Sequence, residues 1–277
     1  MEVARIQEEL DNAVNALRAR TRRIGFVPTM GALHAGHRAL VDAARAAGEG
    51  VVTSIFVNPT QFAPHEDFER YPRDEAADLT LLEAAGCGVV WLPDVPTMYP
   101  SGMATRVDVA GPAEGWEGAA RPGHFRGVAT VVARLFGQVR PDRAYFGEKD
   151  WQQLQVVKRM VADLRLPVEI VPVPTVRDAE GVALSSRNRY LTADESARAP
   201  LLHQCLCDIA RSGATQAALA EARNRLAEAG MIVDYLELVD GQTLARIEHP
   251  AAPGARGARL IAAARLGSVR LLDNIAI

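Results

Sequence analysis

The sequence predicts an α/β fold: a doubly wound parallel sheet followed by a smaller α+β segment. In the first two thirds of the 277-residue chain, short runs rich in β-branched residues alternate with stretches of helical periodicity. After about Val176 the pattern changes to helices rich in Ala and Arg, and then to runs typical of antiparallel strands. A pair of prolines marks the change, so two domains are expected, 1–175 and 176–277.

The individual elements follow from local patterns. Buried parallel strands are expected where short apolar runs are bounded by turn residues, at 23–27, 51–57, 88–92, 143–146 and 168–173. Helices are expected where apolar residues recur every three or four positions, at 38–47, 74–85, 128–139 and 150–164. Residues 1–9 are acidic and have a helical pattern. The C-terminal segment predicts helices at 193–209 and 217–229, a strand at 233–239, and a hairpin of 259–266 with 269–272. The alternation in the first part is typical of a Rossmann-like sheet.

Composition excludes several classes of protein. With 48% hydrophobic and 23% charged residues, the chain has the balance of a folded globular protein and not of a disordered one. No apolar run reaches the length of a membrane span, and the N-terminus lacks the pattern of a secretory signal, so a cytoplasmic protein without membrane contact is expected. A net charge of −3 gives no general attraction to nucleic acid. Three cysteines without a Cys-x-x-Cys pair favour reduced thiols over disulfides or a zinc site.

The first predicted strand-to-helix crossing carries the strongest local signal. The strand ending at Val27 leads into residues 28–37 (PTMGALHAGH), and such a crossing places N–H groups and a helix N-terminus where a phosphate can bind. His34 and His37 share one face of the first helical turn, which suits neutralising charge on a phosphate. Three other interpretations of this segment exist. A Walker phosphate loop is disfavoured, because His37 stands where that motif requires Lys. A zinc site is disfavoured, because no further ligand residue lies near the two histidines in the sequence. The third interpretation, two polar residues at a solvated helix start, stays open.

Lysine usage points to a second position. Lys149 and Lys158 are the only lysines among 31 basic residues. The chain uses arginine for nearly every other positive charge. A lysine at the end of a predicted strand therefore suggests that a compact, flexible ammonium is needed at this position. The alternative is a surface pair of Lys149 with Asp150.

Five segments together carry a family resemblance: 28–37 (PTMGALHAGH), 56–62 (FVNPTQF), 121–125 (RPGHF), 146–150 (FGEKD) and 184–188 (LSSRN). They are similar to the pantothenate synthetases, members of the nucleotidyltransferase superfamily that carries a His-x-Gly-His motif. The resemblance implies an AMP-forming acid–amine ligase of vitamin B5 and coenzyme A biosynthesis. Pantoate and ATP would give pantoyl adenylate and pyrophosphate, and β-alanine would then displace AMP.

The same resemblance implies roles for residues. The catalytic set would be His34, His37, Lys149, Ser185, Ser186 and Arg187. The ATP site would comprise Met30, Gly31, His34, Gly36, His37, Gly147, Glu148, Lys149, Asp150, Val176, Leu184, Ser185, Ser186 and Arg187. Pantoate would contact Met30, Asn58, Gln61 and Gln153, and β-alanine would contact Gln61. Mg²⁺ would accompany ATP, held by phosphates and water and not by a residue of the chain. A homodimer is implied, with the C-terminal domain capping the site.

Some alternatives stay open at this stage. Gln61 and Gln153 are neutral donors that suit the hydroxyls and carboxylate of pantoate, yet either could be surface residues, and Met30 could be core packing. Without the resemblance, residues 185–188 are an ordinary polar turn. Glu117 and Arg121 could pair on a helix end or shape the site entrance.

A cytidylyl- or adenylyltransferase, a tRNA-charging enzyme and a non-catalytic nucleotide-binding module are the competing functions. His124 receives no chemical role, and His65, His203 and His249 are expected to be solvated or in the core.

Overall fold

The computed structural model describes residues 1–64, 66–247 and 257–277, so His65 and His249 lie outside the described residues. The chain forms a six-stranded parallel sheet and a three-stranded antiparallel sheet. The strands are β1 Glu2–Ala4, β2 Ile24–Thr29, β3 Gly50–Ile55, β4 Val89–Trp91, β5 Arg143–Gly147, β6 Glu169–Val173, β7 Met231–Asp240, β8 Ala258–Leu266 and β9 Val269–Ala276. The α-helices are α1 Gln7–Arg18, α2 Ala35–Ala46, α3 Glu75–Ala84, α4 Val95–Met98, α5 Trp116–Ala120, α6 His124–Val139, α7 Trp151–Asp163, α8 Ala193–Arg198, α9 Pro200–Arg211 and α10 Gln216–Glu228. Short 3₁₀ helices are η1 Pro59–Gln61, η2 Glu148–Asp150 and η3 Ser186–Tyr190.

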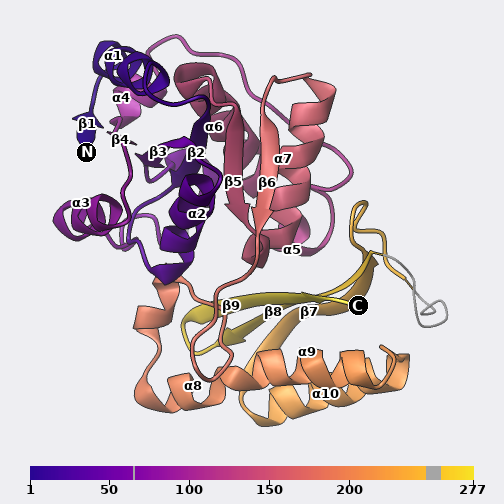
Figure 1. Ribbon diagram of the computed structural model, residues 1–277. Helices are drawn as coiled ribbons and strands as arrows, with labels where there is room; N and C mark the ends of the chain where they lie inside the picture. Colours follow the sequence, from indigo (N-terminus) through magenta and orange to yellow (C-terminus); the bar gives the residue numbers. More distant parts are fainter. Residues whose placement is uncertain (65, 248–256) are drawn as a thin grey trace.

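The predicted fold class is confirmed. The parallel sheet has the order β1-β4-β3-β2-β5-β6, and helices lie on both of its faces (Figure 1). β2 pairs with β3 on one side and with β5 on the other, and the strand order reverses between β2 and β5. In a doubly wound sheet, ligands bind at the carboxyl ends of the strands where the order reverses. The fold therefore directs attention to the loops after β2 and β5.

Two details differ from the sequence prediction. Residues 1–9 were predicted to be helical, but Glu2–Ala4 form the parallel edge strand β1, which pairs with β4 and buries Ala4 completely. Three residues are too few for a period to separate strand from helix. The single helix predicted over 193–209 is two helices, α8 and α9, because Pro200 lacks a backbone N–H and occupies the first turn of α9.

Apolar side chains pack on both faces of the parallel sheet and within the C-terminal segment. Phe26 and Trp91 are fully buried on one face, and Val27 and Val90 on the other. A separate cluster, which includes Leu219, packs α9 and α10 against the antiparallel sheet. Figure 1 shows this sheet lying between those helices and the ends of β5 and β6. Among the described residues, no helix is long and apolar enough to cross a membrane.

Candidate active site

A cavity of about 280 Å³ lies beyond the carboxyl ends of β2 and β5, with the antiparallel sheet as its opposite wall. Of the residues named from the sequence, these line it: Met30, His34, Gly36, His37, Asn58, Gln61, Gly147, Lys149, Asp150, Gln153, Val176, Leu184, Ser185, Ser186 and Arg187. Gly31 and Glu148 are not among the lining residues. Segments separated by more than 100 residues in the chain therefore meet at one site.

Gly31 shapes the loop that leads into α2. Its φ is +83°, and an added Cβ would lie 2.9 Å from Asp78 Oδ2. The buried Asp78 carboxylate accepts hydrogen bonds from the backbone N–H groups of Ala32 (2.9 Å) and Leu33 (2.7 Å). Burial raises the pKa of Asp78 even though both bonds favour the anion. Asp78 therefore fixes the loop through two backbone N–H groups, while Met30 and His34 on either side of them line the cavity.

His34 and His37 cap the start of α2 with their own rings. His34 Nδ1 accepts from Gly36 N (3.1 Å), and His37 Nδ1 accepts from His34 N (3.2 Å). Burial, and then Lys149, lower the pKa of His34 to about 4. Burial, and then His34, lower the pKa of His37 to about 3. With Nδ1 accepting, each neutral ring carries its proton on Nε2.

This geometry changes the interpretation of the two histidines. The sequence assigned them to neutralising charge on a phosphate. In the structure both are neutral near pH 7, because desolvation, the neighbouring ring with its centroid 4.2 Å away and Lys149 lower both pKa values well below 7. What they offer an anion is a pair of Nε2–H donors.

Lys149 lies in η2, the single turn that follows β5. Its side chain is only 19% exposed, and Nζ lies 3.3 Å from Asp150 Oδ1. Burial disfavours ionised Asp150, but the Lys149 ammonium outweighs it and keeps the pKa of that carboxyl below its usual value. The expected Lys–Asp pair therefore exists, and both members face the cavity instead of the outer surface.

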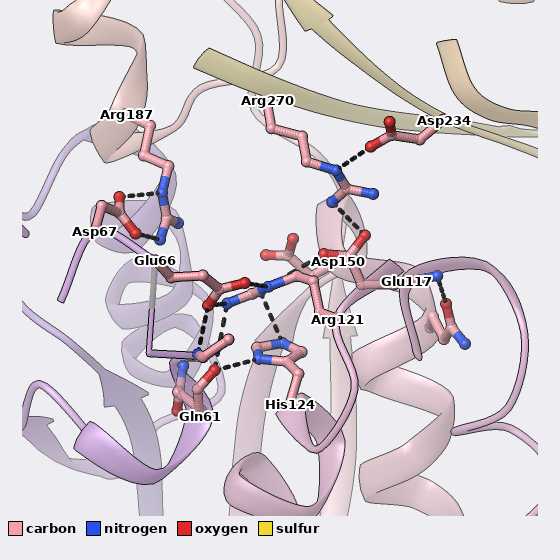
Figure 2. Close-up of polar contacts among 12 residues, drawn as sticks. Gln61, Glu66, Asp67, Glu117, Arg121, His124, Asp150, Arg187, Asp234 and Arg270 are labelled. Atoms are coloured by element: carbon pink, nitrogen blue, oxygen red, sulfur yellow. Dashed lines mark hydrogen bonds and ion pairs between the residues drawn. The ribbon is translucent and has the colours of Figure 1, made fainter. Parts of the chain in front are cut away.

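The 185–188 segment reaches the same cavity from the C-terminal part of the chain. Ser186 Oγ is buried and donates to the carbonyl of Ala32 (2.9 Å), which ties η3 to the loop before α2. Arg187 forms a two-point ion pair with Asp67, Nε–Oδ2 2.8 Å and Nη2–Oδ1 2.9 Å (Figure 2). Its guanidinium also lies over the ring of Tyr71. Two of the three guanidinium nitrogens are thus occupied by a carboxylate.

Gln61 and Asn58 form a polar corner at the end of β3. Gln61 is 8% exposed; its Oε1 accepts from Asn58 Nδ2 (2.9 Å), and its Nε2 lies 3.0 Å from Met30 Sδ. Asn58 Nδ2 also donates to the carbonyl of Gly127 (3.2 Å). A Cβ at Gly127 would lie 2.3 Å from Thr60 O, so only glycine allows α6 to approach this closely. Because sulfur is a weak acceptor, the Gln61 amide is free to donate to a stronger one.

Arg121 and His124, which received no chemical role from the sequence, hold Gln61 by its backbone (Figure 2). The Gln61 carbonyl accepts from His124 Nδ1 (2.9 Å) and Arg121 Nη2 (3.3 Å). Arg121 Nη1 donates to His124 Nε2 (3.2 Å), which fixes the tautomer with the proton on Nδ1. Burial and the Arg121 charge lower the pKa of His124 to about 4. The RPGHF segment was the available signal, but it did not reveal which atom these residues hold.

A chain of ion pairs links this corner to the antiparallel sheet, as Figure 2 shows. Both Arg121 nitrogens Nε and Nη2 lie 2.7 Å from Glu66, and Nη1 lies 3.5 Å from Glu117 Oε1. Arg270 of β9 bonds Glu117 Oε2 and Asp234 of β7. Glu117 and Arg121 therefore pair and also line the cavity, which combines the two alternatives left open by their spacing.

The chain is similar to known proteins along nearly its whole length. The sequence model of the family described as pantoate–β-alanine ligase matches residues 2–276. The chain belongs to this family. A pantothenate synthetase of Acidiphilium cryptum is 62% identical over 259 residues, 92% of each chain, and one of Granulibacter bethesdensis is 56% identical over 99% of this chain and 96% of its own.

Solved structures of the family have the same fold. Pantothenate synthetase from Thermus thermophilus superposes with a TM-score of 0.91 at 50% identity, covering 99% of both chains. A pantoate–β-alanine ligase from Francisella tularensis, described as complexed with β,γ-ATP and β-alanine, gives a TM-score of 0.84 at 33% identity, covering 100% of this chain and 97% of its own.

Proposed function

The chain ligates pantoate to β-alanine at the expense of ATP, and we propose that it does so through a pantoyl adenylate formed in the cavity described above. One observation carries the proposal. His34, His37, Lys149, Asn58 and Gln61 all line one cavity of about 280 Å³. Anion donors and neutral amides in one enclosed site suit a triphosphate beside a hydroxy acid.

In the first step a carboxylate oxygen of pantoate attacks the α-phosphorus of ATP. A C(O)O–P bond forms, the bond from the α-phosphorus to the bridging oxygen breaks, and pyrophosphate leaves with that electron pair. Negative charge grows on the α-phosphate and the leaving group, where the imidazole Nε2–H groups and Lys149 can donate. Because both rings are already oriented through Nδ1, no reorganisation is needed as charge develops.

In the second step the amine of β-alanine attacks the acyl carbon of the adenylate. The C–N bond forms, the C–O bond to AMP breaks, and the ammonium proton is released to solvent or to AMP. We assign Gln61 to both pantoate and β-alanine; in support, its side chain borders Met30 and Asn58 in the cavity while its backbone is fixed by His124 and Arg121. Enclosure by the antiparallel sheet protects the reactive adenylate from water.

The binding site for Mg²⁺ is proposed to be the triphosphate. Among the residues that the structure describes, no three His, Cys, Asp or Glu side chains are grouped to hold a metal ion. Asp150 is paired with Lys149. The metal would therefore enter the site as part of the MgATP substrate.

ATP–pyrophosphate exchange in the presence of pantoate and the absence of β-alanine tests the proposal. Exchange requires a reversible adenylation, so pantoate-dependent exchange is expected. A folded, ATP-binding protein without exchange would contradict the adenylate and favour a non-catalytic nucleotide-binding module.

We also propose a homodimer, a cytoplasmic location and a domain boundary near residue 175, which follow from the resemblance and the sequence pattern. Sedimentation at micromolar concentration measures the first, since a dimer doubles the 29.9 kDa mass of the chain.

A further inference from the structure

The backbone of the Lys149 turn is bonded to the last strand of the antiparallel sheet. Asn274 of β9 is 4% exposed, and its Nδ2 donates to two consecutive carbonyls of η2, Glu148 O and Lys149 O, at 2.9 Å each. A single 3₁₀ turn has few hydrogen bonds of its own to fix it. The side chain of a residue 125 positions away therefore supplies the restraint that the local sequence cannot.

The Asn274 amide is itself fixed in orientation. Its Oδ1 accepts from Arg259 Nε at 2.6 Å, and since Arg has no acceptor, the NH₂ group must be the end that faces the two carbonyls. Arg259 is 8% exposed, bonds Glu148 Oε2 through Nη2 (2.8 Å), and lies with its Cζ 3.4 Å from the centroid of the Trp151 ring. These contacts close a ring from β9 to β8 and back to η2.

The residue before Asn274 in β9, Asp273, also fixes the strand through ion pairs and hydrogen bonds. Asp273 is 3% exposed in its side chain and pairs with both terminal nitrogens of Arg177 (2.6 and 2.7 Å) and with His203 Nδ1 (3.1 Å). Its Oδ1 also accepts from Asn274 N (2.7 Å). These bonds hold the strand beside Asn274 in place, so the Asn274 amide can fix the position of the η2 backbone.

We propose that Asn274, backed by Arg259, is a positioning residue that sets where the Lys149 ammonium lies during adenylation. The inference rests on the proposed function of Lys149 as a phosphate donor. It assigns the antiparallel sheet a part in the reaction beyond covering the cavity. It also gives Glu148 a place: its carboxylate does not line the cavity and instead anchors Arg259.

The first experiment compares pantoate-dependent exchange in the wild type and in Asn274→Ala. A donor shifted by about 1 Å costs on the order of 100-fold in rate, so a loss of about 10- to 100-fold in kcat is expected, with KM for pantoate changed by less than about threefold. Ile275→Ala is the matched control, because Ile275 is the next residue of β9 and packs into the C-terminal apolar cluster. The control is expected to lower the melting temperature and leave kcat near the wild-type value.

A double-mutant cycle with Lys149→Ala separates positioning from direct contact, because Asn274 also borders the cavity. If Asn274 acts through Lys149, removing it from Lys149→Ala changes the residual rate by less than about threefold. An undiminished loss of about 10- to 100-fold in that background would overturn the proposal. So would a wild-type kcat in folded Asn274→Ala.

Two further results are possible: a variant that does not fold, and a wild-type protein without exchange. If Asn274→Ala does not fold, Arg259→Lys replaces it: the variant keeps the charge over Trp151 but cannot reach Asn274 and Glu148 together, and a loss of about three- to tenfold in kcat, cancelled by Lys149→Ala, is expected. Wild-type kcat in Arg259→Lys would then refute the inference. Wild-type protein without exchange would instead refute the proposed adenylation, and the inference with it.

Discussion

The two walls of the cavity differ in how their residues are presented. On the parallel-sheet side, functional groups lie in the short segments that follow β2, β3 and β5, as in the sequence 28–37. On the antiparallel side, Arg270 and Asn274 come from within a regular strand, and their partners are on other elements. One wall carries donors toward the substrate, and the other fixes where those donors lie. Loops at a sheet edge can tolerate exposed polar groups, whereas the Asn274 amide has both of its polar atoms paired within the fold.

The largest effect should come from the donor wall. Lys149→Ala is expected to lower the exchange rate about 100- to 1000-fold, the usual cost of one preorganised donor to developing charge. Exchange assays with labelled pyrophosphate measure it. Lys158→Ala is the matched control, because it removes the only other lysine, which lies on α7 outside the cavity lining. Equal rates for the two variants would remove Lys149 from the mechanism.

A smaller effect is expected at the polar corner. Gln61→Glu keeps the size of the side chain, replaces a hydrogen-bond donor with an anion, and under the proposed function places that anion beside the pantoate carboxylate. KM for pantoate should rise about 10- to 100-fold while KM for ATP changes little, as initial-rate kinetics would measure. A rise confined to ATP would place pantoate elsewhere.

Acid should weaken the fold through the buried histidines before it reaches the carboxylates. The pKa values of His34, His37 and His124 lie at about 4, 3 and 4 in the folded chain and near 6.5 when unfolded. Between pH 6.5 and about 4 the unfolded chain binds more protons, so the free energy of unfolding falls as pH falls.

Urea unfolding from about pH 7 to about pH 4.5 measures this slope. Each neutral histidine contributes at most about 1.4 kcal/mol per pH unit. His124→Asn should reduce the slope by one such contribution. An unchanged slope would show that His124 is not held neutral.

The smallest effect is expected at Asp234 of β7, which pairs with Arg270 but does not line the cavity. Asp234→Asn leaves Arg270 paired with Glu117, so the exchange rate should fall by less than about threefold. A loss as large as that of Lys149→Ala would mean that this wall contributes directly to the chemistry and would erase the distinction between the two walls.

The donor wall could be predicted from the sequence because its functional residues lie in short contiguous segments. Strand–helix alternation predicted the parallel sheet, and the crossing at 28–37 with the lysine at 149 predicted the phosphate side. Sequence reasoning missed β1, whose three residues acquire strand structure only by pairing with β4. The role of Asn274 was also not predicted, because the sequence of a strand does not show which distant carbonyls an asparagine side chain will bond. The protonation of His34 and His37 likewise depends on burial, which no local pattern gives.

Isotope transfer tests the central claim most directly. Pantoate labelled with ¹⁸O in its carboxylate is incubated with ATP, Mg²⁺ and β-alanine, and the products are analysed by mass spectrometry. Attack of the carboxylate on the α-phosphorus predicts one labelled oxygen in the phosphate of AMP and none in pyrophosphate. Label in inorganic phosphate, with ADP as the nucleotide product, or unlabelled AMP, would contradict an adenylate formed at this cavity.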